Sequence, residues 1–87
     1  MDEKIIKILS EKLDDSLNEN EDIIELIRCF ENIDSDSLHM GIVIGRLYNS
    51  FFYQHRRMLK RDPSKDEFTE FIDFIKSNRK LFSESIH

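Results

Sequence analysis

His55 is the residue of this sequence whose type and position most suggest chemistry. It falls between pairs of apolar residues, Phe51-Phe52 before it and Met58-Leu59 after it. That setting predicts a core histidine whose ring nitrogens bond a carbonyl or a carboxylate, and a pH-sensitive or catalytic role is the alternative. No serine, cysteine or second histidine lies at a spacing that would make His55 the base of a nucleophilic triad.

Metal-binding patterns are incomplete in the sequence. Glu84 and His87 match the E-x-x-H spacing of di-metal helix bundles, but those sites need two such motifs and further glutamates. Cys29 and His39 would supply two of the four ligands of a structural zinc site, and Cys29 is better interpreted as a small buried apolar residue. We therefore expect no catalytic residue, no metal site and no cofactor, and the chain is not expected to be an enzyme.

A basic and aromatic stripe recurs at helical spacing in the second half of the chain. It consists of Arg46, Asn49, Tyr53, Arg56, Arg57, Lys60 and Arg61. Arginine and lysine bind phosphates and tyrosine stacks on bases, so the stripe could bind nucleic acid. The same residue types could anchor an acidic protein partner.

The distribution of charge leaves a third interpretation of the stripe open. Residues 1–44 carry twelve acids and four bases, residues 45–87 carry six acids and nine bases, and the whole chain has a net charge of −5. The acidic first half could simply pair with the basic stripe and cover it. A net negative charge also weakens long-range attraction to phosphate.

Several apolar residues fall outside the main apolar faces that the helical periodicity predicts. They include Phe74 and Leu81, which are seven residues apart and would align on one helix, together with Ile42, Val43 and Ile8. Stray apolar residues that align suggest a second buried surface, and in a chain this short we expect that surface to lie between molecules. The main functional expectation is therefore a non-enzymatic module for protein interaction or self-association, with nucleic-acid binding as the alternative.

Gly41 and Gly45 have the G-x-x-x-G spacing that lets two helix backbones approach closely. The polar residues nearby argue against a membrane helix. We expect a tight crossing with another helix of the same chain, and a crossing between two chains is the dimer hypothesis.

Composition limits the elements that can position these residues. The 87 residues are 39% apolar and 36% charged, with two glycines, one proline and one cysteine, which fits one small all-α domain over 1–87 without a disulfide. The sequence shows no secretory leader and no apolar run long enough to span a membrane, so a cytoplasmic location is expected, with no membrane partner and no small-molecule substrate.

Apolar periodicity and capping signals predict helices at about 2–17, 21–33, 37–61 and 64–82, with a frayed tail at 83–87. Asn20 is the expected cap of the second helix, and Ser64 with Glu67 forms a capping box before the fourth. Each predicted helix has one apolar face that we expect to be buried. In the first two helices these faces consist of Ile5, Ile6, Leu9, Leu13 and Leu17, and of Ile23, Leu26, Ile27, Phe30 and Ile33. In the last two they consist of Met40, Ile44, Leu47, Tyr48, Phe51, Phe52, Met58 and Leu59, and of Phe68, Phe71, Ile72, Ile75 and Phe82. A four-helix antiparallel bundle is expected, and a three-helix core crossed by the first helix is the competing arrangement.

Overall fold

Helices are the regular elements of the computed structural model, which describes residues 1–18, 21–30 and 32–81. They are α1 (Glu3–Leu17), α2 (Glu21–Arg28), α3 (Ser35–Leu59) and α4 (Lys65–Ser77), followed by a helical turn at 79–81. The described residues contain no strand, and the expected all-α helical bundle is confirmed. The described residues do not include Asn20, Phe82 or the tail 83–87, which contains the Glu84–His87 pair.

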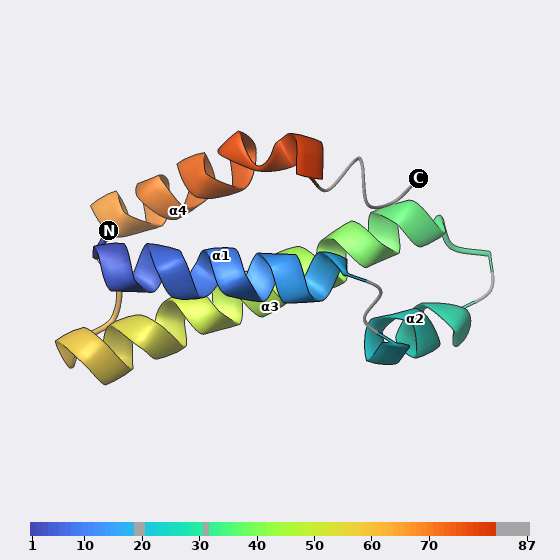
Figure 1. Cartoon of the computed structure of the whole chain (residues 1–87), viewed down its shortest axis with the longest axis horizontal. Coiled ribbons are helices and arrows are strands. Elements are labelled where there is room, and N and C mark those ends of the chain that lie inside the picture. Colours follow the sequence, from blue (N-terminus) through green and yellow to red (C-terminus); the bar gives the residue numbers. More distant parts are fainter. Residues whose placement is uncertain (19–20, 31, 82–87) are drawn as a thin grey trace.

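The three long helices form the body of the molecule, and α2 lies beside one end of α3 (Figure 1). Successive long helices run in opposite directions, so α1 and α4 are both antiparallel to α3. The competing arrangement, in which the first helix lies across a core made by the others, is wrong. Ile5, Leu9 and Leu13 of α1 are all buried, whereas α2 buries Ile23 alone among its residues.

The core is one cluster of side chains from all four helices. It consists of Ile5, Leu9, Leu13, Ile23, Val43, Leu47, Phe51 and Phe71. Phe51 and Phe71 join α3 to α4 by stacking, with ring centroids 4.6 Å apart and planes 23° apart. Burying each large apolar side chain contributes roughly 1.5–3 kcal/mol, and partly buried apolar residues such as Leu17, Met40 and Ile75 pack around this cluster and add to it.

The second helix ends at Arg28 and not at Ile33. The amides of Cys29 and Phe30 bond to carbonyls three residues earlier, which tightens the last turn, and Asn32 has a left-handed φ of 64°. Phe30 and Ile33 were expected on the buried face of this helix, and that expectation is wrong because the chain leaves the helix before them. Both side chains are about half exposed.

Side chains cap the starts of the other three helices, and the predicted capping box before α4 is confirmed. The Asp2 carboxylate accepts the Lys4 amide at 2.7 Å, and the Asp34 carboxylate accepts the Asp36 amide at 3.0 Å. In the capping box, Ser64 Oγ accepts the Glu67 amide at 3.2 Å, and Glu67 Oε1 accepts the Ser64 amide at 2.8 Å. These bonds satisfy backbone donors that the first turn of a helix leaves without partners.

The inner face of α3 is rotated from the face that periodicity predicted. Its buried residues are Val43, Leu47, Ser50, Phe51, Gln54 and His55, whereas Tyr48 is 42% exposed. The expectation that Tyr48 belongs to the core is wrong because α3 packs mainly against α1, and its buried residues lie between Val43 and His55 on another side of the helix. Apolar content alone predicted the face, but the position of α1 determines which residues are covered.

Candidate functional site

An apolar groove of about 380 Å³ lies between α3 and α4. Its lining consists of Ile44 and Tyr48 from α3 and Phe68, Phe71, Ile72, Ile75 and Lys76 from α4. Lys76 brings a positive charge to a lining that is otherwise aliphatic or aromatic. A hollow of this composition can accept an apolar side chain or the apolar face of a helix.

The groove exists because the apolar face of α4 is wider than the surface that α3 covers. Among the α4 residues, only Phe71 is buried, and Phe68 and Ile72 on either side of it are 39% and 37% exposed. The centroid of the Tyr48 ring lies 6.3 Å from the centroid of Phe68 and 6.1 Å from that of Phe71, and both contacts are edge-to-face. The expectation that Phe68 and Ile72 are buried is therefore wrong, and these residues form the wall of the groove.

The surface expected from the stray apolar residues is not a single surface. Val43 is fully buried in the core, and Ile42 and Phe74 are half buried and pack against that core. Phe74 lines a separate hollow of about 290 Å³ between α4 and the start of α1, next to the ion pair of the Met1 amino group with Glu70. Leu81 is 41% exposed. Including Val43 in an exposed surface was wrong because that residue points at α1.

Several cations of the basic stripe have partners inside the chain. Arg46 lies 3.6 Å from the Asp15 carboxylate, Arg56 donates to Asp62 at 2.5 Å, and Arg61 holds both oxygens of Glu67 at 2.6 and 3.1 Å. The acidic first half therefore reaches the stripe at Asp15, and the other two acids belong to the second half. The pairs of Arg46 and Arg56 are largely exposed and therefore weak, so they reduce the free charge of the stripe without blocking it. The pair of Arg61 with Glu67 is better shielded, because the Glu67 side chain is only 15% exposed.

The remaining residues of the stripe differ in exposure and role. Arg57 donates to the Gln54 side chain at 3.1 Å, and Lys60 ends α3 in a left-handed conformation with φ of 60°. Asn49 is exposed, and Tyr53 is 61% exposed, the largest exposed fraction among the large apolar and aromatic side chains of the described residues. The Arg56 guanidinium also lies 5.4 Å from the centroid of the Phe52 ring, which is cation–π geometry.

One end of the stripe faces a second cleft, between α1 and α3, with a volume of about 330 Å³. Its lining adds Lys12 of α1 to Arg46, Asn49, Ser50, Tyr53 and Gln54 of α3. The Ser50 hydroxyl is buried and has no hydrogen-bond partner. Lys12 was missed from the sequence because it is far from the stripe along the chain, and only the packing of α1 on α3 brings the two cations together.

His55 is fully buried against Phe51, as the core interpretation predicted. Its Nδ1 lies 2.7 Å from the Phe51 carbonyl oxygen, and its Nε2 lies 3.3 Å from Glu67 Oε2, out of line for a good hydrogen bond. The ring is closed off from solvent, so a substrate would have no direct access to it. The arrangement instead ties the end of α3 to the start of α4.

Glu67 is the centre of that connection. Arg61 donates two hydrogen bonds to its carboxylate, and this is the main reason that the pKa of Glu67 falls from 4.5 to about 2. Burial opposes the shift, while the Ser64 bonds and the charge of His55 favour it. One carboxylate thus caps α4, binds the linker through Arg61 and faces the buried imidazole.

Gly41 and Gly45 lie on the outer face of α3 and are exposed. A Cβ atom built on either glycine meets nothing within 4 Å. The expected close crossing with another helix of the same chain is wrong, because α1 and α4 pack on other sides of α3. Each glycine costs about 1 kcal/mol relative to alanine inside a helix, and no contact within the described residues accounts for that cost.

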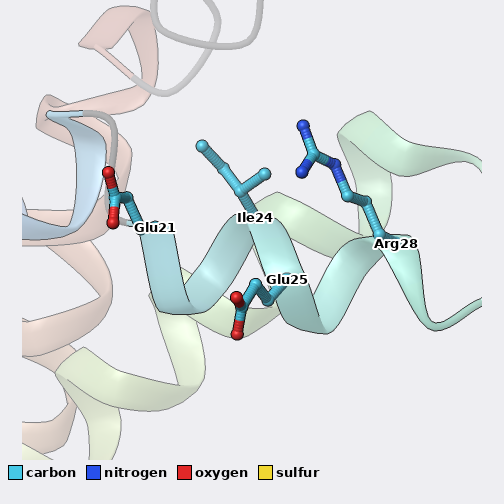
Figure 2. Close-up of a pocket in the computed structure, with 4 residues that line it drawn as sticks. All are labelled: Glu21, Ile24, Glu25 and Arg28. Carbon is cyan, nitrogen blue, oxygen red and sulfur yellow. The ribbon is translucent and has the colours of Figure 1, made fainter.

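A further hollow lies along α2, where Glu21, Ile24, Glu25 and Arg28 line a volume of about 390 Å³ (Figure 2). Glu21, Ile24 and Arg28 point to the same side of the helix in this view, and Glu25 points to another. Cys29 follows this helix and is exposed, so the expectation that it is buried is wrong. In residues 1–18, 21–30 and 32–81, no three His, Cys, Asp or Glu side chains are arranged to hold a metal ion.

No family model matches the chain, and no curated protein or solved structure is significantly similar to it. None of the helices in the described part of the chain is long and apolar enough to cross a membrane.

Proposed function

We propose that this chain is a protein-binding module that receives an apolar surface in the groove between α3 and α4. The observation that carries the proposal is the exposure of Tyr48, Phe68 and Ile72 around one apolar hollow. Aromatic residues surrounded by aliphatic ones are typical of the centre of protein interfaces, where a few such side chains supply most of the binding free energy. Lys76 at the rim favours a partner with an acidic flank.

The balance of burial in α4 supports the same function. A helix that buries one side chain and exposes two large apolar ones leaves apolar area in water, which costs roughly 25 cal/mol per Å². Phe71 in the core and the polar contacts of Glu67 attach α4 to the rest of the molecule, and the exposed parts of Phe68 and Ile72 add apolar area beyond that attachment. A partner that covers the area would recover its free energy.

Site-specific photo-cross-linking in the cells that encode the protein tests this proposal. The photoreactive p-benzoylphenylalanine would replace Phe68 in the groove and, as a matched control, Tyr53, which is an exposed aromatic residue outside the groove. We expect cross-links to protein from position 68 that disappear when Ile72→Glu is added, and none from position 53. Equal cross-linking from both positions, or none from position 68, would contradict the proposal.

Nucleic-acid binding is the second candidate, and the observation that favours it is the cleft between α1 and α3. Lys12 and Arg46 could bind phosphate there, beside the exposed Tyr53 ring. The expected signature is binding of single-stranded DNA or RNA that weakens steeply with salt and is lost in Arg46→Ala. No mobility shift at low salt would end this candidate.

A further inference from the structure

We infer that the partner of the α3–α4 groove is a second copy of this chain, docked as an antiparallel pair of α3 helices that cross at Gly45. This inference rests on the proposed function, because the groove forms one flank of the docking surface. Three observations support it: the spacing of residues on the outer face of α3, the positions of its charges, and the apolar side chains that remain exposed beside it. The arrangement that they define also places Tyr48 of one copy over Gly41 of the other.

The outer face of α3 has the spacing of a helix-pairing seam. Leu38, Gly41, Gly45, Tyr48 and Phe52 follow one another at intervals of three and four residues. The average spacing is 3.5 residues, and residues at this spacing keep facing a partner helix along the whole contact. At 100° per residue, Gly45 points away from Val43, Leu47 and Gln54, which face the core. The glycines of the seam therefore lie on a side of α3 that α1 and α4 leave open, while Tyr48 at its edge touches Phe68 and Phe71 of α4 and Phe52 packs in part against the core.

The charges at the two ends of this face match each other in an antiparallel pair. Asp34 caps α3 eleven residues before Gly45, and Arg56 lies eleven residues after it, so both are about 16 Å from Gly45 along the helix. Both residues lie within 20° of the direction of Gly45 around the helix, and both are exposed. Within the chain, the Asp34 carboxylate accepts the Asp36 amide and Arg56 donates to Asp62, so a pair between copies would share these charges with their internal partners. A two-fold axis through Gly45 would place Asp34 of each copy opposite Arg56 of the other. A parallel pair would instead place like charges together.

The same axis accounts for the exposed tyrosine and the uncontacted glycines. In an antiparallel pair centred on Gly45, Tyr48 of one copy lies over Gly41 of the other and beside its Ile44 at the edge of the groove. Among the described residues, no atom lies within 4 Å of a Cβ atom built at Gly41 or Gly45, so these residues leave the space beside both glycines open to a partner. Close approach of two backbones needs such small residues at the crossing point.

Apolar side chains remain exposed along the flank of the seam. Tyr48 is 42% exposed, and Phe68 and Ile72 of α4, which line the groove beside it, are 39% and 37% exposed. Each partner in an interface of ordinary size buries about 800 Å², and pairing along the 25-residue helix α3 would cover these side chains.

Sedimentation and disulfide trapping of the full chain test the inference together. The wild-type chain is expected to sediment at twice its 10.5 kDa and to dissociate on dilution. In a Cys29→Ser background, Gly45→Cys should form a disulfide-linked dimer under mild oxidation, because residue 45 lies on the axis. Tyr53→Cys, also exposed on α3 but well away from the seam, should stay monomeric. A 10.5 kDa species at all concentrations, or equal trapping at both positions, would overturn the inference.

A charge variant gives an independent measurement in which folding is preserved. Gly45→Glu adds a side chain into open space and should weaken the dimer at least about tenfold, whereas Tyr53→Glu should leave it unchanged. If Gly45→Glu leaves the dimer unchanged, the crossing point is wrong. If the chain is a monomer and position 68 still cross-links to a different protein, the second copy is ruled out and the groove remains a docking site. If position 68 yields no cross-link, the proposed function also fails.

Discussion

The imidazole Nε2 of His55 lies 3.3 Å from Oε2 of Glu67 and joins the C-terminal part of α3 to the first turn of α4. The Phe51 carbonyl accepts the proton on Nδ1, so a second proton on Nε2 would form an ion pair with Glu67. This contact, the two bonds from Arg61 and the capping box converge on one carboxylate. The wall of the groove that α4 provides is therefore held by polar contacts at its N-terminal end and by Phe71 further along.

The stability of the protein should fall as Glu67 is protonated. The pKa of Glu67 is lowered from 4.5 to about 2 in the folded state, mainly by Arg61, so the stabilisation is fully present above pH 4.5 and is lost as the pH falls toward 2. Because Arg61 is half exposed and solvent screens the pair, we expect a loss of about 1–2 kcal/mol. Urea unfolding of wild type and Glu67→Gln at several pH values measures it. The control is Asp66→Asn, an exposed carboxylate in the same turn, which should keep the wild-type pH profile.

Loss of the capping box should destabilise the protein locally. Ser64→Ala removes the oxygen that accepts the Glu67 amide, and we expect a cost of about 1 kcal/mol in the free energy of unfolding. Hydrogen exchange should show faster opening of the first turn of α4, with α1 unaffected. Ser64→Asp restores an acceptor and should recover most of the loss. Uniformly faster exchange in all helices would indicate that the cap acts on global stability alone.

Two phenylalanines of α4 should differ strongly in their contribution to folding. Phe71→Ala removes a buried ring stacked on Phe51 and should cost about 3–4 kcal/mol, whereas Phe68→Ala removes a ring that is 39% exposed and should cost about 1 kcal/mol. Chemical denaturation of the two variants provides the comparison. Equal losses would mean that the groove is closed in solution and that Phe68 belongs to the core.

Gly45→Ala should stabilise the isolated subunit. An added Cβ atom meets nothing within 4 Å, and alanine is favoured over glycine inside a helix by up to about 1 kcal/mol. Thermal unfolding at low protein concentration, where association is absent, should show a higher midpoint. A destabilised variant under these conditions would mean that Gly45 is packed against another part of the chain.

Local signals made the start of α4 and the existence of all four helices predictable. Pro63, Ser64 and Glu67 specify a helix start within a few residues, and the atoms form the bonds that the capping box implies. The end of α2 was missed because apolar periodicity continues through Phe30 and Ile33, while the backbone turns at Asn32. Asn32 itself was the available signal, since asparagine tolerates the left-handed conformation that ends helices.

The candidate site was harder to predict because it depends on how helices pack. Periodicity assigns one apolar face to α3, but this helix packs against α1 and α4 on two different sides, so Val43 is covered and Tyr48 is exposed. The spacing of Gly41 and Gly45 identified two special positions without showing that they face away from the chain. Lys12 and Arg46 line the same cleft only because α1 packs against α3. No local pattern in a single sequence encodes that contact.

The short helix α2 has a practical consequence for work on this molecule. Because α2 contributes one core side chain, Ile23, and then leads into an exposed bend around Phe30 and Ile33, that bend is a natural insertion point. A fluorescent reporter or an affinity tag spliced there would sit at one end of the molecule. The groove between α3 and α4 and the cleft between α1 and α3 would both stay accessible for imaging or capture experiments.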